Sequence, residues 1–239
     1  MTFHGFQRMV RINSAFNRIN RGSSITHSAF DSGYESLSGF NDSFRSIFGR
    51  PPSKTKNKTV INIVRFATPL GPMFGCATPK GICLAEFTDR RMLETEFKYL
   101  CKRLNAVILP GPNPFLDQLQ EQLDEYFCGT RQSFDLPLDT PGSMFQQSVW
   151  KILQDIPYGE TVSYKQQAVN LNNPAIRAVA KANGNNRVAI VIPCHRVIGE
   201  NGNLTGYAGG LSRKKWLLDF EKRHSSQFVQ GEIEFAVKS

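Results

Sequence analysis

The stretch VAIVIPCHRVIG, residues 188–199, joins a run of apolar residues to a cysteine–histidine pair. The run from Val188 to Ile192 predicts a buried strand, and a proline ends it directly before Cys194 and His195. A cysteine in such a position is most often an inert core thiol. What surrounds the pair in the sequence therefore decides whether it has a chemical role.

Two polar residues outside this stretch can turn the thiol into a nucleophile. Glu221 supplies a carboxylate and Asn186 an amide, and both can orient His195. A histidine held in this way can accept the proton of Cys194, and the thiolate that remains is the nucleophilic form. The pattern predicts cysteine-based nucleophilic chemistry and requires no metal ion.

Helical patterns flank the cysteine. An amphipathic helix is predicted from Met144 to Ile156, and Ser163 can open a short helix that bears Tyr164. Asn173 and Pro174 predict the start of a further helix, with Asn as the cap and Pro in the first turn. That helix holds Arg177 and small residues that let its backbone approach another surface closely, either a neighbouring helix or a ligand: Ala175, Ala178, Ala180 and Ala182. The last two helices together predict a helix-turn-helix.

The middle of the chain predicts a small α+β domain. Strands are expected over residues 59–66, around Cys76 and over residues 81–87, followed by helices over residues 93–104 and 116–127. We see no polar constellation here that could perform chemistry. The five cysteines are odd in number and widely spaced, which is typical of reduced thiols and not of a disulfide framework or a zinc site: Cys76, Cys83, Cys101, Cys128 and Cys194.

Positive charge is concentrated at the N-terminus. The chain of 239 residues has a formal net charge of +9, and residues 1–58, with nine Lys or Arg against three acids, supply +6 of it. The same segment predicts three helices, with Ser24 and Ser36 as caps and Gly49 as the stop of the last one. This pattern favours a helix-turn-helix, with a solvated basic tail as the alternative, and residues 53–58 predict a basic linker. A polyanion is an expected partner.

No membrane partner is expected. The sequence contains no apolar run of membrane-spanning length, and its N-terminus has no apolar core of a secretory signal. We therefore expect an intracellular protein, cytoplasmic if bacterial. No obligate protein partner is evident, and a monomer is expected.

Four segments resemble one known family. They are PCHRVIG (residues 193–199), YGETVSYKQ (158–166), NPAIRAVAKANGNN (173–186) and GYAGGLSRKKWLLDFE (206–221). In this order they are similar to the methylated-DNA–protein-cysteine methyltransferases, the O6-alkylguanine-DNA alkyltransferases. Residues 24–54 resemble the second half of an AraC-type helix-turn-helix, so the whole chain is similar to the Ada-type repair proteins. The clustered cysteines of their zinc domain are absent from the sequence, so we expect no methyl-phosphotriester acceptor.

The resemblance implies a multidomain α/β fold. A partial AraC-like helix-turn-helix module is expected over residues 1–52 and a linker over residues 53–58. A ribonuclease-H-like α+β domain is expected over residues 59–138. A mainly helical catalytic domain with a winged helix-turn-helix would follow over residues 139–223, and a C-terminal tail over residues 224–239.

The resemblance also implies a reaction. Double-stranded DNA containing O6-alkylguanine would be bound and the damaged base flipped out, because its O6 is unreachable within the stack. Cys194 would then take the alkyl group irreversibly, once per protein molecule and without a cofactor. Whether O4-alkylthymine is also a substrate stays open.

The implied roles fall into three groups. The catalytic residues would be Cys194 as nucleophile and acceptor, His195, Glu221, Asn186 and Tyr164. The DNA-binding residues would be Arg177, which fills the gap left by the flipped base, with Ala178, Tyr164, Ser163 and Arg45. The substrate pocket would be lined by Tyr207, Ala208, Gly209 and Val197.

Three alternatives remain beside direct repair. An AraC-like transcription regulator could use the alkyltransferase part as a sensor. A Cys–His hydrolase is disfavoured because no oxyanion-hole motif is evident and because the two residues are sequence neighbours. A non-catalytic alkyltransferase-like binder is disfavoured because Cys194 is present.

Overall fold

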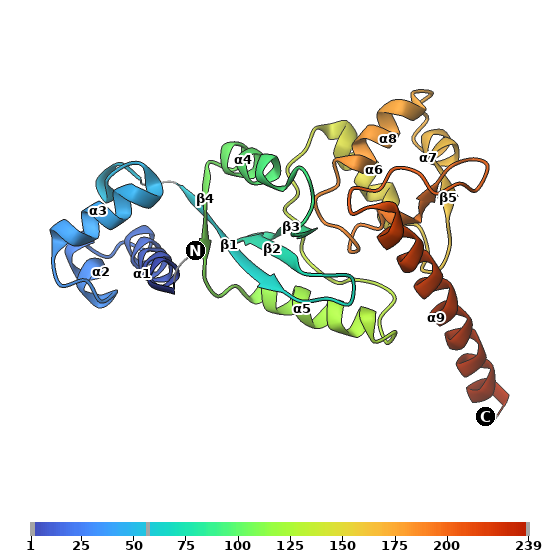
Figure 1. Cartoon of the computed structure of the whole chain (residues 1–239), viewed down its shortest axis with the longest axis horizontal. Coiled ribbons are helices and arrows are strands. Elements are labelled where there is room, and N and C mark those ends of the chain that lie inside the picture. Colours follow the sequence, from blue (N-terminus) through green and yellow to red (C-terminus); the bar gives the residue numbers. More distant parts are fainter. Residues whose placement is uncertain (1–2, 56–57, 238–239) are drawn as a thin grey trace.

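The computed structural model describes residues 3–55 and 58–237. Figure 1 shows a helical module at the N-terminal end, a sheet with helices in the middle, and a mainly helical region at the other end. Within the described residues, no helix has the length and apolar character that a membrane span requires.

The N-terminal module contains the helices that its sequence predicts. Helix α1 spans Phe3–Asn20, α2 spans Ile25–Asp31 and α3 spans Leu37–Phe48. The predicted caps are confirmed, since the Ser24 hydroxyl accepts from the His27 amide and the Ser36 hydroxyl from the Gly39 amide, both at 3.1 Å. Gly49, at φ 69°, ends α3 in the left-handed conformation. The module has a core of its own: Ile12, Ala15, Phe16, Ile19, Ala29, Phe40, Phe44 and Phe48.

This module is packed against the sheet, so the alternative of a solvated tail is wrong. Helix α1 lies on strand β4 (Ala106–Pro110), and Val60 and Leu109 belong to the core cluster of the module. The Asn13 side chain is buried there and donates to the Pro110 carbonyl at 3.1 Å. The expected linker begins with a short 3-10 turn, Pro52–Lys54, and Lys56 and Asn57 lie outside the described residues.

The sheet has the strand order β3-β2-β1-β4. The three predicted strands are confirmed as β1 (Thr59–Phe66), β2 (Met73–Thr78) and β3 (Gly81–Phe87), and they pair as an antiparallel meander. The fourth strand was not predicted, and it pairs parallel to β1 after the crossover helix α4 (Leu93–Arg103). Helix α5 (Pro114–Phe127) covers the opposite face from α4, so both faces are buried (Figure 1).

The C-terminal region surrounds the cysteine–histidine pair with short elements. They are α6 (Met144–Gln154), β5 (Val162–Ser163), α7 (Tyr164–Asn170), α8 (Ile176–Gly184), the 3-10 turn η2 (Cys194–Arg196), β6 (Val197–Ile198) and α9 (Leu211–Val237). Strand β5 pairs parallel to β6. Helix α9 continues through most of the segment expected to be a separate tail, because no proline interrupts it.

Two local predictions are wrong. Residues 188–192 are buried but do not form a strand, because only Val188 pairs, with Ala85, and the chain then turns through Ile190 at φ 73°. An apolar run reports burial and not extension, which explains the error. Helix α8 begins at Ile176 and not at Pro174. Asn173 instead accepts from the Ala175 amide at 2.8 Å, in the turn before the helix.

Candidate active site

Cys194 begins the η2 turn, and its side chain is buried, with the residue only 7% exposed. The Asn186 amide donates to the Cys194 sulfur at 3.2 Å and to the Ile192 carbonyl at 2.8 Å. The side-chain oxygen of Asn186 accepts from the Val188 amide at 3.0 Å. One side chain therefore shapes the turn and also holds the thiol.

Glu221, from α9, is the centre of a buried network. Its Oε1 lies 2.8 Å from Nε2 of His195 and accepts from the Tyr126 hydroxyl at 2.8 Å. Arg196 donates to both carboxylate oxygens, at 2.9 and 3.0 Å, and the Gly159 amide donates at 3.2 Å. Burial opposes ionisation of Glu221, but His195 and Arg196 hold its pKa well below the usual range.

His195 is neutral and keeps one nitrogen available. Burial lowers the pKa of His195, although Glu221 opposes this shift. Because the ionised Glu221 accepts at Nε2, the ring proton is placed there and Nδ1 is the basic nitrogen. Nδ1 is buried and has no hydrogen-bond partner among the described residues. A buried unpaired acceptor of this kind is a position for a bridging water or a proton to be transferred.

The thiol itself is protonated at neutral pH. Burial raises the pKa of Cys194 to about 11, against the hydrogen bond from Asn186. A nucleophile in this state needs a base, and His195 is the sequence neighbour that can supply one. The arrangement can therefore deprotonate a buried thiol.

Two tyrosines lie near the thiol. The Tyr164 hydroxyl lies 3.3 Å from the Thr205 carbonyl and 3.1 Å from that of Gly206, and burial raises the pKa of Tyr164 to about 12. The Tyr207 hydroxyl is buried and has no partner in the described part of the chain, and burial raises its pKa well above the usual range. Both hydroxyls therefore stay protonated and can donate.

The expected pocket residues lie beside this pair. The ring of Tyr207 stands edge-on to His195, with centroids 6.4 Å apart. Position 209 requires glycine, since a Cβ there would lie 2.7 Å from the Tyr207 ring and 3.1 Å from Phe87. Val197 is fully buried, whereas Ala208 is exposed.

The expected DNA-binding residues fall into two groups. Arg177 and Ala178 are exposed on α8, and Ser163 caps α7 by accepting from the Gln166 amide at 3.0 Å. Helices α7 and α8 pack against each other, so these residues share one region with Tyr164. Arg45 is exposed on α3 at the other end of the molecule (Figure 1), so the structure does not bring it to the others.

Several site residues were missed from the sequence. Lys214 is fully buried and donates to the carbonyls of Val197 and Thr205, which fixes the loop after the cysteine, and burial lowers its pKa to about 8. Its position on the apolar face of α9, three residues before Leu217, was an available signal. Tyr126 reaches Glu221 from α5, and no sequence pattern indicates this contact.

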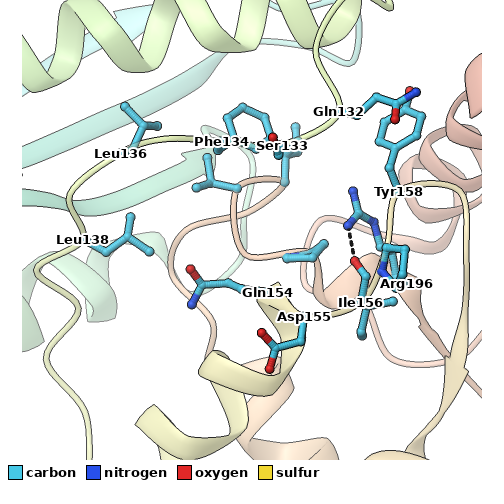
Figure 2. Close-up of a pocket in the computed structure, with 14 residues that line it drawn as sticks. Gln132, Ser133, Phe134, Leu136, Leu138, Gln154, Asp155, Ile156, Tyr158 and Arg196 are labelled. Atoms are coloured by element: carbon cyan, nitrogen blue, oxygen red, sulfur yellow. Dashed lines mark hydrogen bonds between the residues drawn. The ribbon is translucent and has the colours of Figure 1, made fainter. Parts of the chain in front are cut away.

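The far side of the Arg196 network borders a cavity of about 200 Å³. Figure 2 shows its wall, with Arg196 hydrogen-bonded to the Ile156 carbonyl and Tyr158 beside it. The segment that connects α5 to α6 closes the other side, through Phe134, Leu136 and Leu138. Cys194 does not line this cavity, so the cavity is separate from the pocket expected at the thiol.

Comparisons with known proteins agree with this geometry. Residues 144–223 match a family described as "6-O-methylguanine DNA methyltransferase, DNA binding domain", and residues 65–140 match the corresponding "ribonuclease-like domain". Residues 1–58 match a family described as a helix-turn-helix domain. The matches over residues 144–223 and 1–58 contain the segments that carry the resemblance, and the match over residues 65–140 covers the expected α+β domain.

Relatives and solved structures point the same way. A methylated-DNA–protein-cysteine methyltransferase of Methanosarcina barkeri is 42% identical over 159 residues, covering 66% of this chain and 94% of the relative. An inducible methylated-DNA–protein-cysteine methyltransferase of Bacillus subtilis is 41% identical over 152 residues, covering 63% and 84%. The crystal structure of Mycobacterium tuberculosis OGT in complex with DNA is similar at a TM-score of 0.58 and 37% identity, covering 69% and 94%.

A mixed α/β fold with a four-stranded sheet, joined to a buried thiol beside a histidine–glutamate pair, defines a class of protein that reacts through a cysteine. The chain belongs to the methylated-DNA–protein-cysteine methyltransferase family. Its function is DNA repair, which the relatives favour over transcription regulation with an alkyltransferase sensor.

Proposed function

We propose that Cys194 is the residue that accepts the alkyl group, and that the group comes from O6 of guanine in double-stranded DNA. The observation that carries the proposal is the pairing of a thiol held by Asn186 at 3.2 Å with a His195 ring held by Glu221 at 2.8 Å. Cys194 has a histidine, His195, as its sequence neighbour, and this histidine can act as a base. The other four have no histidine beside them in the sequence.

The transfer has a balanced sequence of steps. His195 accepts the thiol proton at Nδ1 through a water, and the sulfur attacks the alkyl carbon. The S–C bond forms as the C–O6 bond breaks, and its electron pair passes to the guanine. The Tyr164 hydroxyl donates a proton to the departing guanine, and the proton held by His195 restores the phenol. The thioether is a poor leaving group, so each protein molecule reacts once.

The DNA is bound by α7 and α8, with β5 and β6 as the wing of a winged helix-turn-helix. The small residues of α8 let it lie in the minor groove, as the exposed Ala178 illustrates. Arg177 fills the gap left by the flipped base, while Ser163 and Tyr164 stabilise the phosphate turn. Tyr207, Ala208, Gly209 and Val197 line the pocket that receives the base. Binding weakens with salt because phosphate counterions are released.

The N-terminal module adds sequence-independent contact. Arg45 is exposed on α3 and can pair with phosphate, whereas Asp42 on the same helix would repel it. The protein acts as a monomer inside the cell, and its five free cysteines suit a reducing compartment.

The proposal is tested by locating the transferred group. The protein is incubated with a duplex that contains O6-methylguanine, digested, and analysed by mass spectrometry. One methyl group is expected on the peptide with Cys194, in a single stoichiometric burst. Cys194→Ser is expected to abolish transfer, whereas Cys128→Ser, a change at an exposed cysteine, is the matched control and keeps it. Methyl on another cysteine, or repeated turnover, contradicts the proposal.

A further inference from the structure

A buried arginine of the sheet domain reaches the turn that holds the thiol. Arg90 follows β3, is 8% exposed, and forms ion pairs with Glu86 and Glu96. Its Nη1 donates to the Asn186 carbonyl at 2.9 Å, and its Nη2 donates to the Gly184 carbonyl at 3.0 Å. The two carboxylates therefore aim one guanidinium at two backbone carbonyls of the other domain.

These carbonyls belong to the C-terminal end of α8. Gly184 is the last residue of that helix, and Asn186 follows two residues later. The last carbonyls of a helix have no partner within the helix, and a cation placed there is favoured by the helix dipole. Arg90 thus supplies both the donors and the charge that this helix end requires.

The carbonyl of Asn186 and the donor to the thiol belong to one residue. Arg90 holds the backbone of Asn186, and the side chain of Asn186 donates to the Cys194 sulfur at 3.2 Å. A displacement of this backbone would move the amide away from the sulfur. Asn186 thus links the Arg90 guanidinium to the Cys194 sulfur, although Arg90 and Cys194 come from different domains.

We propose that Arg90 is a positioning residue for alkyl transfer: through the backbone of Gly184 and Asn186, it fixes the Asn186 amide on the thiol and anchors α8. The proposal rests on the proposed role of Cys194 as acceptor. It gives the sheet domain a part in the chemistry, because that domain provides the guanidinium and both carboxylates that orient it.

Arg187 provides a matched control within the same interface. It is also buried, pairs with the same Glu96, and stacks over the Tyr99 ring at 4.0 Å. Its Nη1 donates to the Pro141 carbonyl at 3.2 Å and not to the residues that hold the thiol. Substitution of the Arg187 side chain therefore disturbs the same charge cluster but leaves in place the hydrogen bonds from Arg90 to Gly184 and Asn186.

The test compares Arg90→Lys with Arg187→Lys in the full chain. Lysine retains the charge but presents a single point donor, so it cannot make the forked contact to two carbonyls. The first readout is the rate of Cys194 carboxamidomethylation by iodoacetamide between pH 7 and pH 11, followed peptide by peptide. The other charged and titratable groups facing the thiol are unchanged in both variants: Glu86, Lys214, His195, Tyr164 and Tyr207.

Arg90→Lys is expected to shift the pH profile of Cys194 upward and to slow single-turnover methyl transfer about tenfold, as expected for a misplaced reacting group. Arg187→Lys is expected to leave both within about twofold. In an Asn186→Ala background, Arg90→Lys is expected to add no further loss, because both changes remove the same donor. An unchanged profile in Arg90→Lys, an equal shift in Arg187→Lys, or additive losses would overturn the proposal.

A second variant and a measurement without DNA separate the role of Arg90 from the role of Cys194. If Arg90→Lys does not fold, the double variant Arg90→Gln, Glu86→Gln removes one charge of each sign. Because Glu86 itself raises the pKa of Cys194, this variant is judged by single-turnover methyl transfer, which is expected to slow about tenfold. The iodoacetamide profile does not involve DNA, so it tests the coupling of Arg90 to the thiol separately. Failure of the proposed function would appear instead as methyl on another cysteine of the unsubstituted protein.

Discussion

Replacement of His195 by glutamine should change how the rate of methyl transfer depends on pH. The thiol of Cys194 has a pKa of about 11, so only about one molecule in a thousand holds a thiolate at pH 8. With His195 present, the base removes the proton during the reaction, and the rate above the histidine pKa does not depend on pH. Without the base, the rate follows the small fraction of preformed thiolate.

The expected loss follows from that fraction. His195→Gln should be slower than the parent by up to about a thousandfold at pH 8 and by about tenfold at pH 10, because the thiolate increases tenfold per pH unit. The fold should survive, because the introduced amide can donate to Glu221, and Arg196 and Tyr126 still pair with that carboxylate.

The assay is rapid-quench single-turnover transfer from a duplex with a radiolabelled methyl group, between pH 7 and pH 10. His27→Gln, at an exposed position on α2, is the control and should keep the parent profile. A pH-independent rate in His195→Gln, or a loss of the same size at every pH, would refute the assignment of His195 as the base.

Three further predictions concern stability and DNA. Tyr126→Phe leaves the buried Glu221 with one donor fewer and should cost about 1–3 kcal/mol of unfolding free energy in urea, so an unchanged midpoint would contradict the network. The pKa of Glu221 is lower in the folded state than its ordinary value of 4.5. The ionised carboxylate therefore stabilises the fold fully above pH 4.5, and this contribution is lost as the pH falls further. The difference in unfolding free energy between the parent and Glu221→Gln, measured in urea, should become smaller from pH 7 to pH 3, and a larger difference at pH 3 would contradict this. Arg177→Ala should slow transfer from duplex DNA but not from the free alkylated base, measured by the same mass shift, and an equal loss on both substrates would exclude a role in base flipping.

The sequence predicted most elements whose ends carry a local signal. Ser24, Ser36 and Ser163 cap helices as expected, because a serine side chain satisfies the amides of the first turn wherever the chain leads next. Strand β4 was missed because its five residues are bounded by two helices and contain no alternation. The parallel pairing with β1 is long-range and leaves no pattern within either segment.

In the site, too, some contacts were predicted from the sequence and others were not. Glu221 contacts His195 as predicted, whereas Asn186 contacts the Cys194 sulfur and not His195, so the prediction that Asn186 orients His195 is wrong. The roles of these residues in the reaction stay predictions. Contacts from the sheet domain, such as that of Tyr126, could not be predicted, since they depend on how two domains meet.

The outer edges of the sheet are both occupied. Backbone bridges to Leu138 and Val188 cover β3, and α1 covers β4. An open strand edge is a template for another chain, and β4 would present the apolar Val107 and Leu109 together with its unpaired backbone groups. The helical module therefore also protects the protein against aggregation, and a fragment shortened to begin at Thr59 would be expected to self-associate even with every residue of the reaction intact.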